Sequence, residues 1–389
     1  METDRLFTCP YCRVKSCLLP KGVFRYVLSH VADPGKEIVF FPYWRYKGTR
    51  FCCTENEIRH QFVDVTHQAV ESSYFPASMG LRAQAMRLAF VSPLTQGRFL
   101  APALSLQDII LRQEARFKTA MAGRNVNHQS HVGEVHSLIY APFYIVTQVV
   151  DAILNRPVSG PLPDFFMNTL PESDPPDWQM HFLSALCPSC GWNLSGERNA
   201  VVLTCTNCNS AWQALGSSLK PVPVCFFPDD EADIFLPFWR IKADVSGIPL
   251  SSYADLVHLA NLPRVMQKGW DRLEFRFWSL AFKLSPKEFL SLSIRMNLMQ
   301  PQEELKSGNP PGALYPTTLS VIEAADTLKT TLAGMMKPAE TGFTKLPQIL
   351  IKALRFTLVY IPFRSGHHEW LQPRYGLAIN KNMLSLTDH

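Results

Sequence analysis

Two closely spaced pairs of cysteines constrain the fold of this 389-residue chain more than any other feature. Cys187 and Cys190 enclose Pro-Ser, Cys205 and Cys208 enclose Thr-Asn, and 14 residues separate the two pairs. A tight CxxC turn supplies two thiolates without strain, and a short hairpin brings the second pair alongside. The spacing therefore predicts one metal ion held by four sulfurs. Because such a site has no open position for water or substrate, we expect a structural metal.

The segment from residue 185 to residue 213 resembles the zinc-ribbon group. The resemblance rests on the two cysteine pairs, on the turn signal Ser195-Gly196, and on residues 200–203 (AVVL) as a returning strand. It implies a structural Zn²⁺ ion as the cofactor. A rubredoxin-like iron site is an alternative, because tetrahedral all-sulfur ligation also suits iron. Two disulfides, or free thiols, are further alternatives, although CxxC pairs in a chain without a visible secretion signal favour a metal.

An internal similarity predicts that the chain is a duplication. Residues 39–47 (VFFPYWRYK) and 234–242 (IFLPFWRIK) are identical at five of nine positions, and the other pairs are apolar or aromatic. Residues 138–143 (LIYAPF) and 358–363 (LVYIPF) share Leu, Tyr, Pro and Phe. In each half a CxxC motif comes first, the tryptophan motif second and the Tyr-x-Pro-Phe motif third.

We therefore predict an α+β protein with two duplicated halves, each a mostly antiparallel sheet with one or two helices. The expected divisions are an N-terminal half over 1–165, a proline-rich linker over 166–184, the zinc ribbon over 185–213, and a C-terminal half over 214–389. Alternation predicts strands at both tryptophan motifs, and Pro42 and Pro237 are expected at an edge or a bend. Apolar spacing predicts helices over 104–121 and 318–336, and strands over 272–278 and 349–362.

The N-terminal half carries one CxxC knuckle, Cys9 and Cys12, without a second pair before its tryptophan motif. The candidates for two further ligands are Cys17, Cys52, Cys53 and His30. A second metal site made of Cys9, Cys12, Cys17 and Cys53 is one interpretation. We favour a vestigial knuckle with free thiols, because duplicated copies often lose their metal when the fold is otherwise secured. Adjacent Cys52 and Cys53 face opposite sides of a strand, so at most one of them would easily reach a shared metal. Cys225 is expected to be a small buried apolar residue.

Two histidine groups suggest chemistry, but each has a simpler interpretation. His128, His131 and His136 lie in a polar segment that we expect to be a solvated loop. His367 and His368 follow Gly366 and are expected at a hairpin tip. No Walker loop, GxGxxG, GxSxG or HExxH motif is present, so no catalytic residue is assigned and an enzyme is the less favoured class.

The composition indicates little about which kinds of partner the chain binds. The net charge is +5 and the cationic residues are dispersed, which disfavours nucleic-acid binding. No apolar stretch is long enough for a membrane-spanning helix, so we expect a cytoplasmic protein whose peripheral membrane contact is neither required nor excluded. Our leading hypothesis is a non-catalytic zinc-ribbon adaptor or scaffold that binds other protein subunits. The alternatives are a nucleic-acid-binding protein, with Arg45, Lys47, Arg240 and Lys242 in one basic groove, and an enzyme with its site between the halves.

Overall fold

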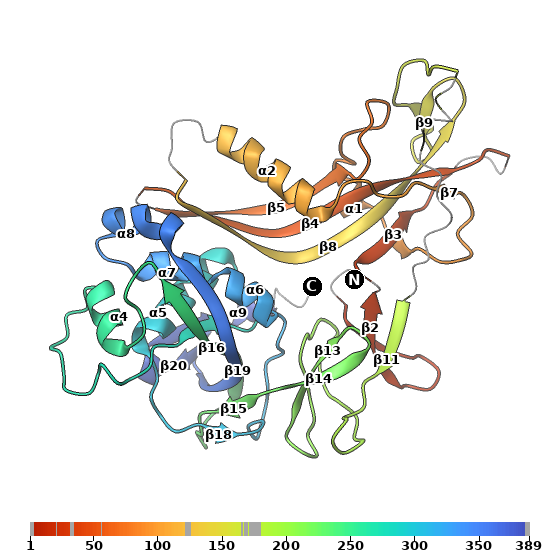
Figure 1. Cartoon of the computed structure of the whole chain (residues 1–389). Coiled ribbons are helices and arrows are strands. Elements are labelled where there is room, and N and C mark those ends of the chain that lie inside the picture. The colour runs from red at the N-terminus through yellow and green to blue at the C-terminus, as the bar shows by residue number, and fades with distance from the viewer. Residues whose placement is uncertain are drawn as a thin grey trace.

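The chain folds into two large and two small β-sheets with short helices around them (Figure 1). The computed structural model describes residues 4–20, 22–31, 35–55, 57–120, 126–164, 166, 170 and 180–385. Most strand pairs are antiparallel, so the predicted α+β class is confirmed. Of the predicted linker, residues 167–169 and 171–179 lie outside the described residues.

The first sheet belongs to the N-terminal part of the chain. Its central strands run in the order β5-β4-β8-β3-β6, and short strands β7, β9 and β10 extend it. The elements are β3 (Phe24–Leu28), β4 (Val39–Cys53), β5 (Ile58–Gln68), α1 (Arg82–Ala85), β6 (Leu88–Phe90), β7 (Arg98–Phe99), α2 (Leu106–Ala120), β8 (His128–Ile145), β9 (Val149–Asp151) and β10 (Arg156–Pro157).

The second sheet has the strand order β17-β16-β19-β15-β18, and β20 and β21 continue from β19. Its elements are β15 (Val224–Phe226), β16 (Ile234–Ser246), α4 (Tyr253–Leu259), β17 (Phe277–Leu280), α5 (Pro286–Met299), β18 (Lys306–Ser307), α6 (Val321–Asp326), α7 (Leu328–Met335), α8 (Ala339–Lys345), β19 (Leu350–Ser365), β20 (Glu369–Gln372), β21 (Leu377–Asn380) and α9 (Lys381–Ser385).

Two three-stranded sheets lie together beneath one end of β8 (Figure 1). One combines the N-terminal hairpin, β1 (Leu6–Thr8) and β2 (Lys15–Pro20), with β11 (Met180–Ser184). The other is formed by β12 (Leu203–Thr204), β13 (Ala211–Leu215) and β14 (Ser218–Val222). Because β14 pairs with β13, the sheet extends beyond the expected end at residue 213. We call residues 185–222 the cysteine module.

The two tryptophan motifs are strands with matching partners. Trp44 of β4 lies opposite Leu138 of β8, and Trp239 of β16 lies opposite Leu358 of β19. The Trp44 indole donates to the carbonyl of Leu104 at 2.7 Å, just before α2, and that of Trp239 donates to Leu319 at 2.9 Å, just before α6. Trp239 is fully buried and Trp44 is partly buried.

The prolines of these motifs do not lie at edges, as we expected, but inside central strands. Pro42 is paired with β8, and the ladder between β4 and β5 ends one residue later, at Tyr43. The Pro42 carbonyl accepts from the Ala69 N–H on the β5 side. Since N–H and C=O of one residue point to the same side of an antiparallel strand, the missing donor falls where β5 has ended. Pro237 has the same arrangement with Ala281.

The single helix expected over residues 318–336 is two helices. Ser320 caps α6 in a capping box with Glu323, and the helix ends at Asp326. The Thr327 hydroxyl donates to the Ala324 carbonyl at 2.7 Å, and α7 starts at the next residue. A threonine that bonds back to the preceding turn bends or interrupts a helix. The strand expected over 272–278 begins only at Phe277.

The far end of the first sheet packs on the helices of the C-terminal part (Figure 1). Phe51 and Cys53 of β4 and Val132 of β8 belong to the same buried cluster as the second sheet. The hydroxyls of Ser130 and Thr330 on α7 lie 2.7 Å apart in this contact. The buried core of the C-terminal part therefore includes side chains from the far end of the first sheet.

Candidate metal centre and central cavity

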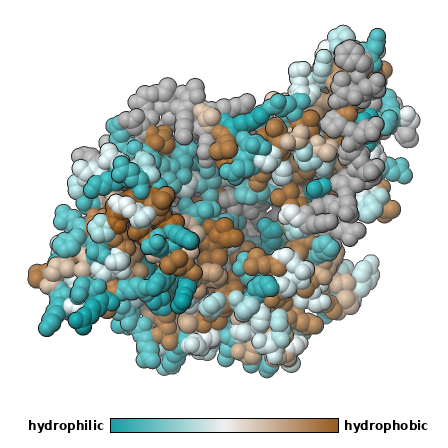
Figure 2. Space-filling view, in the orientation of Figure 1, coloured by the Kyte–Doolittle hydropathy of each residue, from teal (hydrophilic) through white to brown (hydrophobic). Residues whose placement is uncertain are grey.

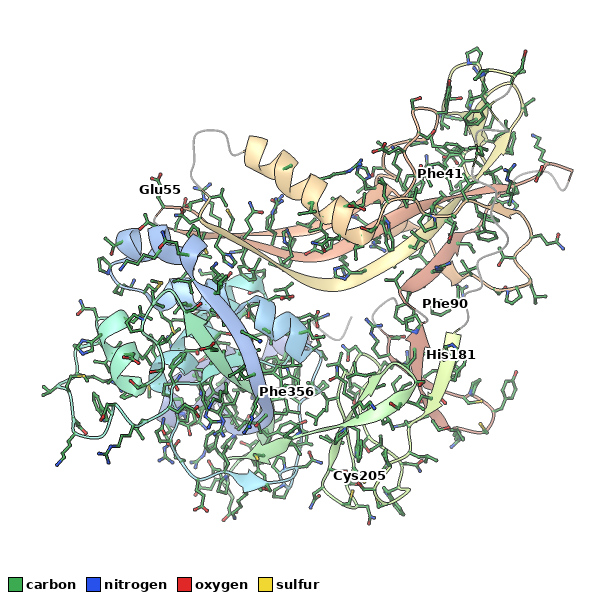
Figure 3. The ribbon with its side chains drawn as sticks, in the orientation of Figure 1. Phe41, Glu55, Phe90, His181, Cys205 and Phe356 are labelled. Atoms are coloured by element: carbon green, nitrogen blue, oxygen red, sulfur yellow. The ribbon has the colours of Figure 1, made fainter. Side chains whose placement is uncertain are left out.

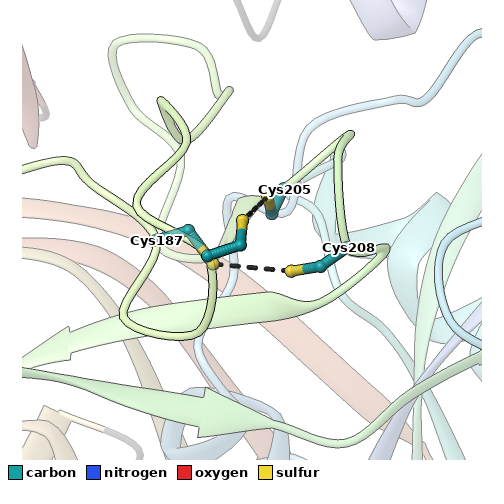
Figure 4. Close-up of side chains that lie close together, drawn as sticks. Cys187, Cys205 and Cys208 are labelled. Atoms are coloured by element: carbon teal, nitrogen blue, oxygen red, sulfur yellow. Dashed lines mark hydrogen bonds between the residues drawn. The ribbon is translucent and has the colours of Figure 1, made fainter.

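The structure brings Cys187, Cys190, Cys205 and Cys208 together, and Figure 4 labels three of them. The Sγ atoms of Cys187 and Cys208 are 3.5 Å apart, as are those of Cys190 and Cys205, and all four lie within 4.8 Å of one another. A disulfide bond is about 2.05 Å long, so these contacts are not disulfides. Four sulfurs at about 2.3 Å from one ion would stand about 3.8 Å apart, so the cluster has the size of a four-thiolate metal site.

Both cysteine pairs lie on the same backbone turn. The Cys187 N–H donates to the Trp192 carbonyl at 2.7 Å, and the Cys205 N–H donates to Ser210 at 2.8 Å, five residues on in each case. The residue after each second cysteine has a positive φ, 74° at Gly191 and 54° at Asn209. The turn folds the chain back, so both thiols of a pair point the same way.

Local hydrogen bonds and burial set the thiol pKa values. Burial opposes ionisation of Cys187, but donors from the Ser210 hydroxyl and from the N–H groups of Ser189 and Cys190 lower its pKa to about 6. Burial raises the pKa of Cys205 to about 11. Since a metal binds thiolates, binding at neutral pH must displace the proton of Cys205.

The cysteine module contacts both large parts of the chain. Its Arg198 carbonyl accepts the N–H groups of Arg5 and Leu6 beside β1. On the other side the Val201 N–H donates to Thr317, and the Asn309 side chain donates to the Ser210 carbonyl at 3.1 Å. Metal binding at this module would therefore fix a segment that touches both the N-terminal hairpin and the C-terminal part.

The cysteines considered for a second metal site do not converge. Cys17 is buried between the hairpin and the cysteine module, whereas Cys53 is buried in the core around the second sheet. Cys9 and Cys12 lie on the loop between β1 and β2. Over the described residues, the only group of three or more potential ligands is the four-cysteine cluster. The site of Cys9, Cys12, Cys17 and Cys53 is thus not formed within one chain.

A cavity of about 540 Å³ lies where the first sheet, α6 and the cysteine module face one another. Tyr46, His131 and His136 line it from β4 and β8, and their rings are in contact, with centroids 5.8 Å apart for Tyr46 and His131 and 5.2 Å for Tyr46 and His136. Glu323 and Asp326 approach from α6, and Arg5 from the N-terminal segment. Titratable groups from both halves therefore meet here.

The surroundings of the cavity side chains shift their pKa values. Burial, with Arg50 and His136 beside it, lowers the pKa of His131 to about 4. Burial and nearby Arg5 lower the pKa of His136. Burial and neighbouring Glu323 raise the pKa of Asp326. At neutral pH both imidazoles are neutral and can accept a hydrogen bond.

Our expectation of a solvated loop around the histidines is wrong, because His128, His131 and His136 belong to β8. Residues 128–136 (HQSHVGEVH) show no regular alternation of polar and apolar residues, so little in the sequence indicated this strand. Arg5, Tyr46, Glu323 and Asp326 were not identified as site residues from the sequence. They are distant along the chain, and only the packing of α6 against β8 brings them together. His367 and His368 lie on the β19–β20 turn, as expected.

No protein-family model matches the chain, and neither a curated protein nor a solved structure matches it. Across the described ranges, none of the helices has the length and apolar character needed to cross a membrane.

Proposed function

We propose that this chain is a non-catalytic zinc-ribbon adaptor that holds other protein subunits in a complex. In this proposal two duplicated α+β units, residues 1–165 and 214–389, are joined by a linker at 166–184 and a ribbon at 185–213. The ribbon binds Zn²⁺ through Cys187, Cys190, Cys205 and Cys208. Its role is structural, because four protein sulfurs leave no position for a reactant.

The duplication is supported by details that the sequence motifs do not contain. Both sheets have the same strand order around β4 and β16, with β3 and β15 parallel to the partner strand. Both ladders shift register at the same place, after Lys47 in β4 and after Lys242 in β16. A bulge is a local feature that a sheet does not require, so its recurrence three residues after each tryptophan favours a common origin.

The adaptor role rests on one difference between the units. In the first sheet the ends of β4 and β8 beyond the bulge are covered by α6 and α7. In the second sheet β19 exposes apolar residues around the matching bulge: Leu350 beyond it, Leu354 at it and Phe356 before it, which are 68%, 52% and 37% accessible. Figure 2 shows hydrophobic surface over this part of the molecule, and Figure 3 labels Phe356 on β19. We infer that this region binds a protein partner that presents a helical segment, as α7 does for the first sheet.

The nucleic-acid alternative is less well supported. It needs Arg45, Lys47, Arg240 and Lys242 in one accessible basic groove. Arg45 is buried and paired with Asp64, and Lys242 is paired with Glu274. Cations already neutralised by carboxylates release few counterions from a polyanion, so they contribute little affinity.

The proposal is tested by photo-crosslinking in extracts of the native cells, with a photoreactive amino acid at position 354. Wild-type chain should migrate as a complex, and the crosslinks should join it to another protein subunit. Leu354→Glu should remove that other subunit from the complex. Leu94→Glu is the matched control, because Leu94 is 88% exposed on a distant loop and should leave the complex intact. A monomeric chain in extracts, or a complex insensitive to Leu354→Glu, would sink the adaptor role.

A second candidate function is supported by the central cavity. An enzyme or small-ligand protein with its site between the halves requires titratable groups from both, and His131, His136, Glu323 and Asp326 meet that requirement. The two uncharged imidazoles favour a neutral ligand with hydroxyl or amide donors. Native mass spectrometry of gently purified protein tests this candidate. A ligand that is lost on filling the cavity with Ala214→Trp, while folding persists, would support it, and a ligand-free chain would count against it.

A further inference from the structure

A third CxxC pair lies on the loop between β1 and β2. Cys9 and Cys12 enclose Pro-Tyr there, and the loop has the backbone turn of the two metal-binding pairs. The Cys9 N–H donates to the Val14 carbonyl at 2.9 Å, five residues on, as in the other two turns. Arg13, directly after Cys12, has a φ of 58°, matching Gly191 and Asn209. An arginine adopts this left-handed conformation only where the turn demands it.

This turn presents two sulfur ligands, and among the described residues no other ligand joins them. Zinc in an all-protein site takes four ligands. In the described part of the molecule no third cysteine, histidine or carboxylate joins Cys9 and Cys12 in a cluster. Cys12 is exposed and Cys9 is partly exposed, so both sulfurs are accessible from outside.

Exposed apolar side chains lie around this cysteine pair. Tyr11, between the two cysteines, is 94% exposed, whereas the corresponding positions of the complete site are Ser189 and Asn207. Phe7 on β1 and Phe182 on β11 are 43% and 61% exposed, and Val14, just before β2, is 48% exposed. The Phe7 and Phe182 rings lie 6.2 Å apart, so they form one patch. In Figure 1 this loop lies at the edge of the molecule beside β11, where a second molecule can approach.

We propose that two copies of this chain share one Zn²⁺ ion, with Cys9 and Cys12 of each copy as its four ligands. A two-fold axis through the ion gives each chain an identical role, as in most homodimers. The same operation brings the Tyr11, Phe7, Val14 and Phe182 patches of the two copies together. The proposed ion is separate from that of the cysteine module, and the inference does not depend on the adaptor function.

Metal content and mass of the full-length chain test the shared site. Reduced protein reconstituted with zinc chloride should hold about 1.5 zinc ions per chain, because one ion serves each chain and one serves each pair. Light scattering should give twice the 44.0 kDa of one chain. Cys9→Ser/Cys12→Ser should hold about one zinc per chain and run as a monomer. Cys225→Ser is the control, since Cys225 lies on β15 outside both sites and should leave the dimer unchanged.

Three results would overturn the shared site. They are a zinc-loaded wild type that is monomeric, a wild type with one zinc per chain, and a double variant that still dimerises. Phe182→Glu tests the same interface without touching a ligand, so this test does not depend on the folding of the double variant. This substitution should weaken the dimer about tenfold or more, because it buries a charge in the interface. When ¹¹³Cd replaces zinc and the same fraction of the chains is dimeric, the resonance of the two cysteine-module ions should remain about twice as intense as that of the one shared ion. A dimer of unchanged affinity in Phe182→Glu would also contradict the inference.

Discussion

At the scale of single residues, equivalent tryptophans have unequal surroundings. Both indoles donate to a carbonyl that precedes a helix, but Trp239 is fully buried and Trp44 is partly exposed. The sequence could predict their position on strands from the alternation of the motif. It could not predict the difference in burial, because that depends on which helices pack over each sheet.

Trp239→Ala should lower the free energy of unfolding by about 3–5 kcal/mol, the cost of deleting a large buried aromatic side chain. Trp44→Ala should cost less, because part of its side chain is already in water. Urea unfolding followed by circular dichroism measures both. Trp192→Ala is the control, since Trp192 is 57% exposed and its loss should change stability by about 0.5 kcal/mol or less. Equal effects for Trp239 and Trp192 would refute the core role.

Cys205→Ser should remove the metal from the cysteine module and loosen the N-terminal hairpin as well. Leu6 and Cys17 of the hairpin share a buried cluster with Cys205, so disorder in the module removes their packing partner. Metal analysis and hydrogen exchange of residues 5–20 measure the two effects. If metal is retained, or if the hairpin keeps its protection after metal is lost, this account of the module is wrong.

His131 should make stability depend on pH. Its pKa is about 4 in the folded chain and 6.5 when unperturbed, so the unfolded state binds the proton more tightly. The stability from neutral His131 is complete above pH 6.5 and is lost as the pH falls towards 4. Melting temperatures from pH 7 to pH 4.5 should therefore fall less steeply in His131→Gln than in wild type. His367→Gln, on an exposed turn, should keep the wild-type slope; equal slopes in all three proteins would contradict the prediction.

At the scale of elements, the sequence motifs predict the strands well, but they do not predict where a helix is interrupted or where a strand ladder ends. The strands at 39–47, 234–242 and 349–362 were predictable because alternation and β-forming residues agree. The break at Thr327 was not, because a helical apolar pattern continues across it. The prolines were placed wrongly, since a ladder can end inside a central strand and leave room for a residue without a donor.

The contact between the first sheet and α7 should stabilise both halves together. Phe51 is 2% exposed and lies in the core of the C-terminal part, so Phe51→Ala should cost about 3–5 kcal/mol. Calorimetry should show the single melting transition become broader or divide, because the link between the cores is weakened. Phe62→Ala on β5 is the control, with a side chain that is 65% exposed. An unchanged transition in Phe51→Ala would argue that the halves are independent.

At the scale of the whole molecule, the two sites differ in how far sequence could foresee them. The spacing of the four cysteines in the module predicts their site, because all four ligands lie within a stretch of 22 residues. The central cavity has no such signal. Arg5 and Asp326 are neighbours only because the cysteine module, α6 and the first sheet close around one space. The similar strand order of the two sheets could be predicted in part. Two short sequence motifs indicated it, and the matching bulges and indole hydrogen bonds support it.

The central claim is that Cys187, Cys190, Cys205 and Cys208 form a closed structural metal site. X-ray absorption at the metal edge tests it most directly, on Cys9→Ser/Cys12→Ser protein so that only this site contributes. We predict a zinc edge and a shell of four sulfurs at about 2.3 Å, with no lighter ligand. An oxygen or nitrogen atom in the shell, or protein purified under reducing conditions without chelator that contains no metal, would contradict the claim.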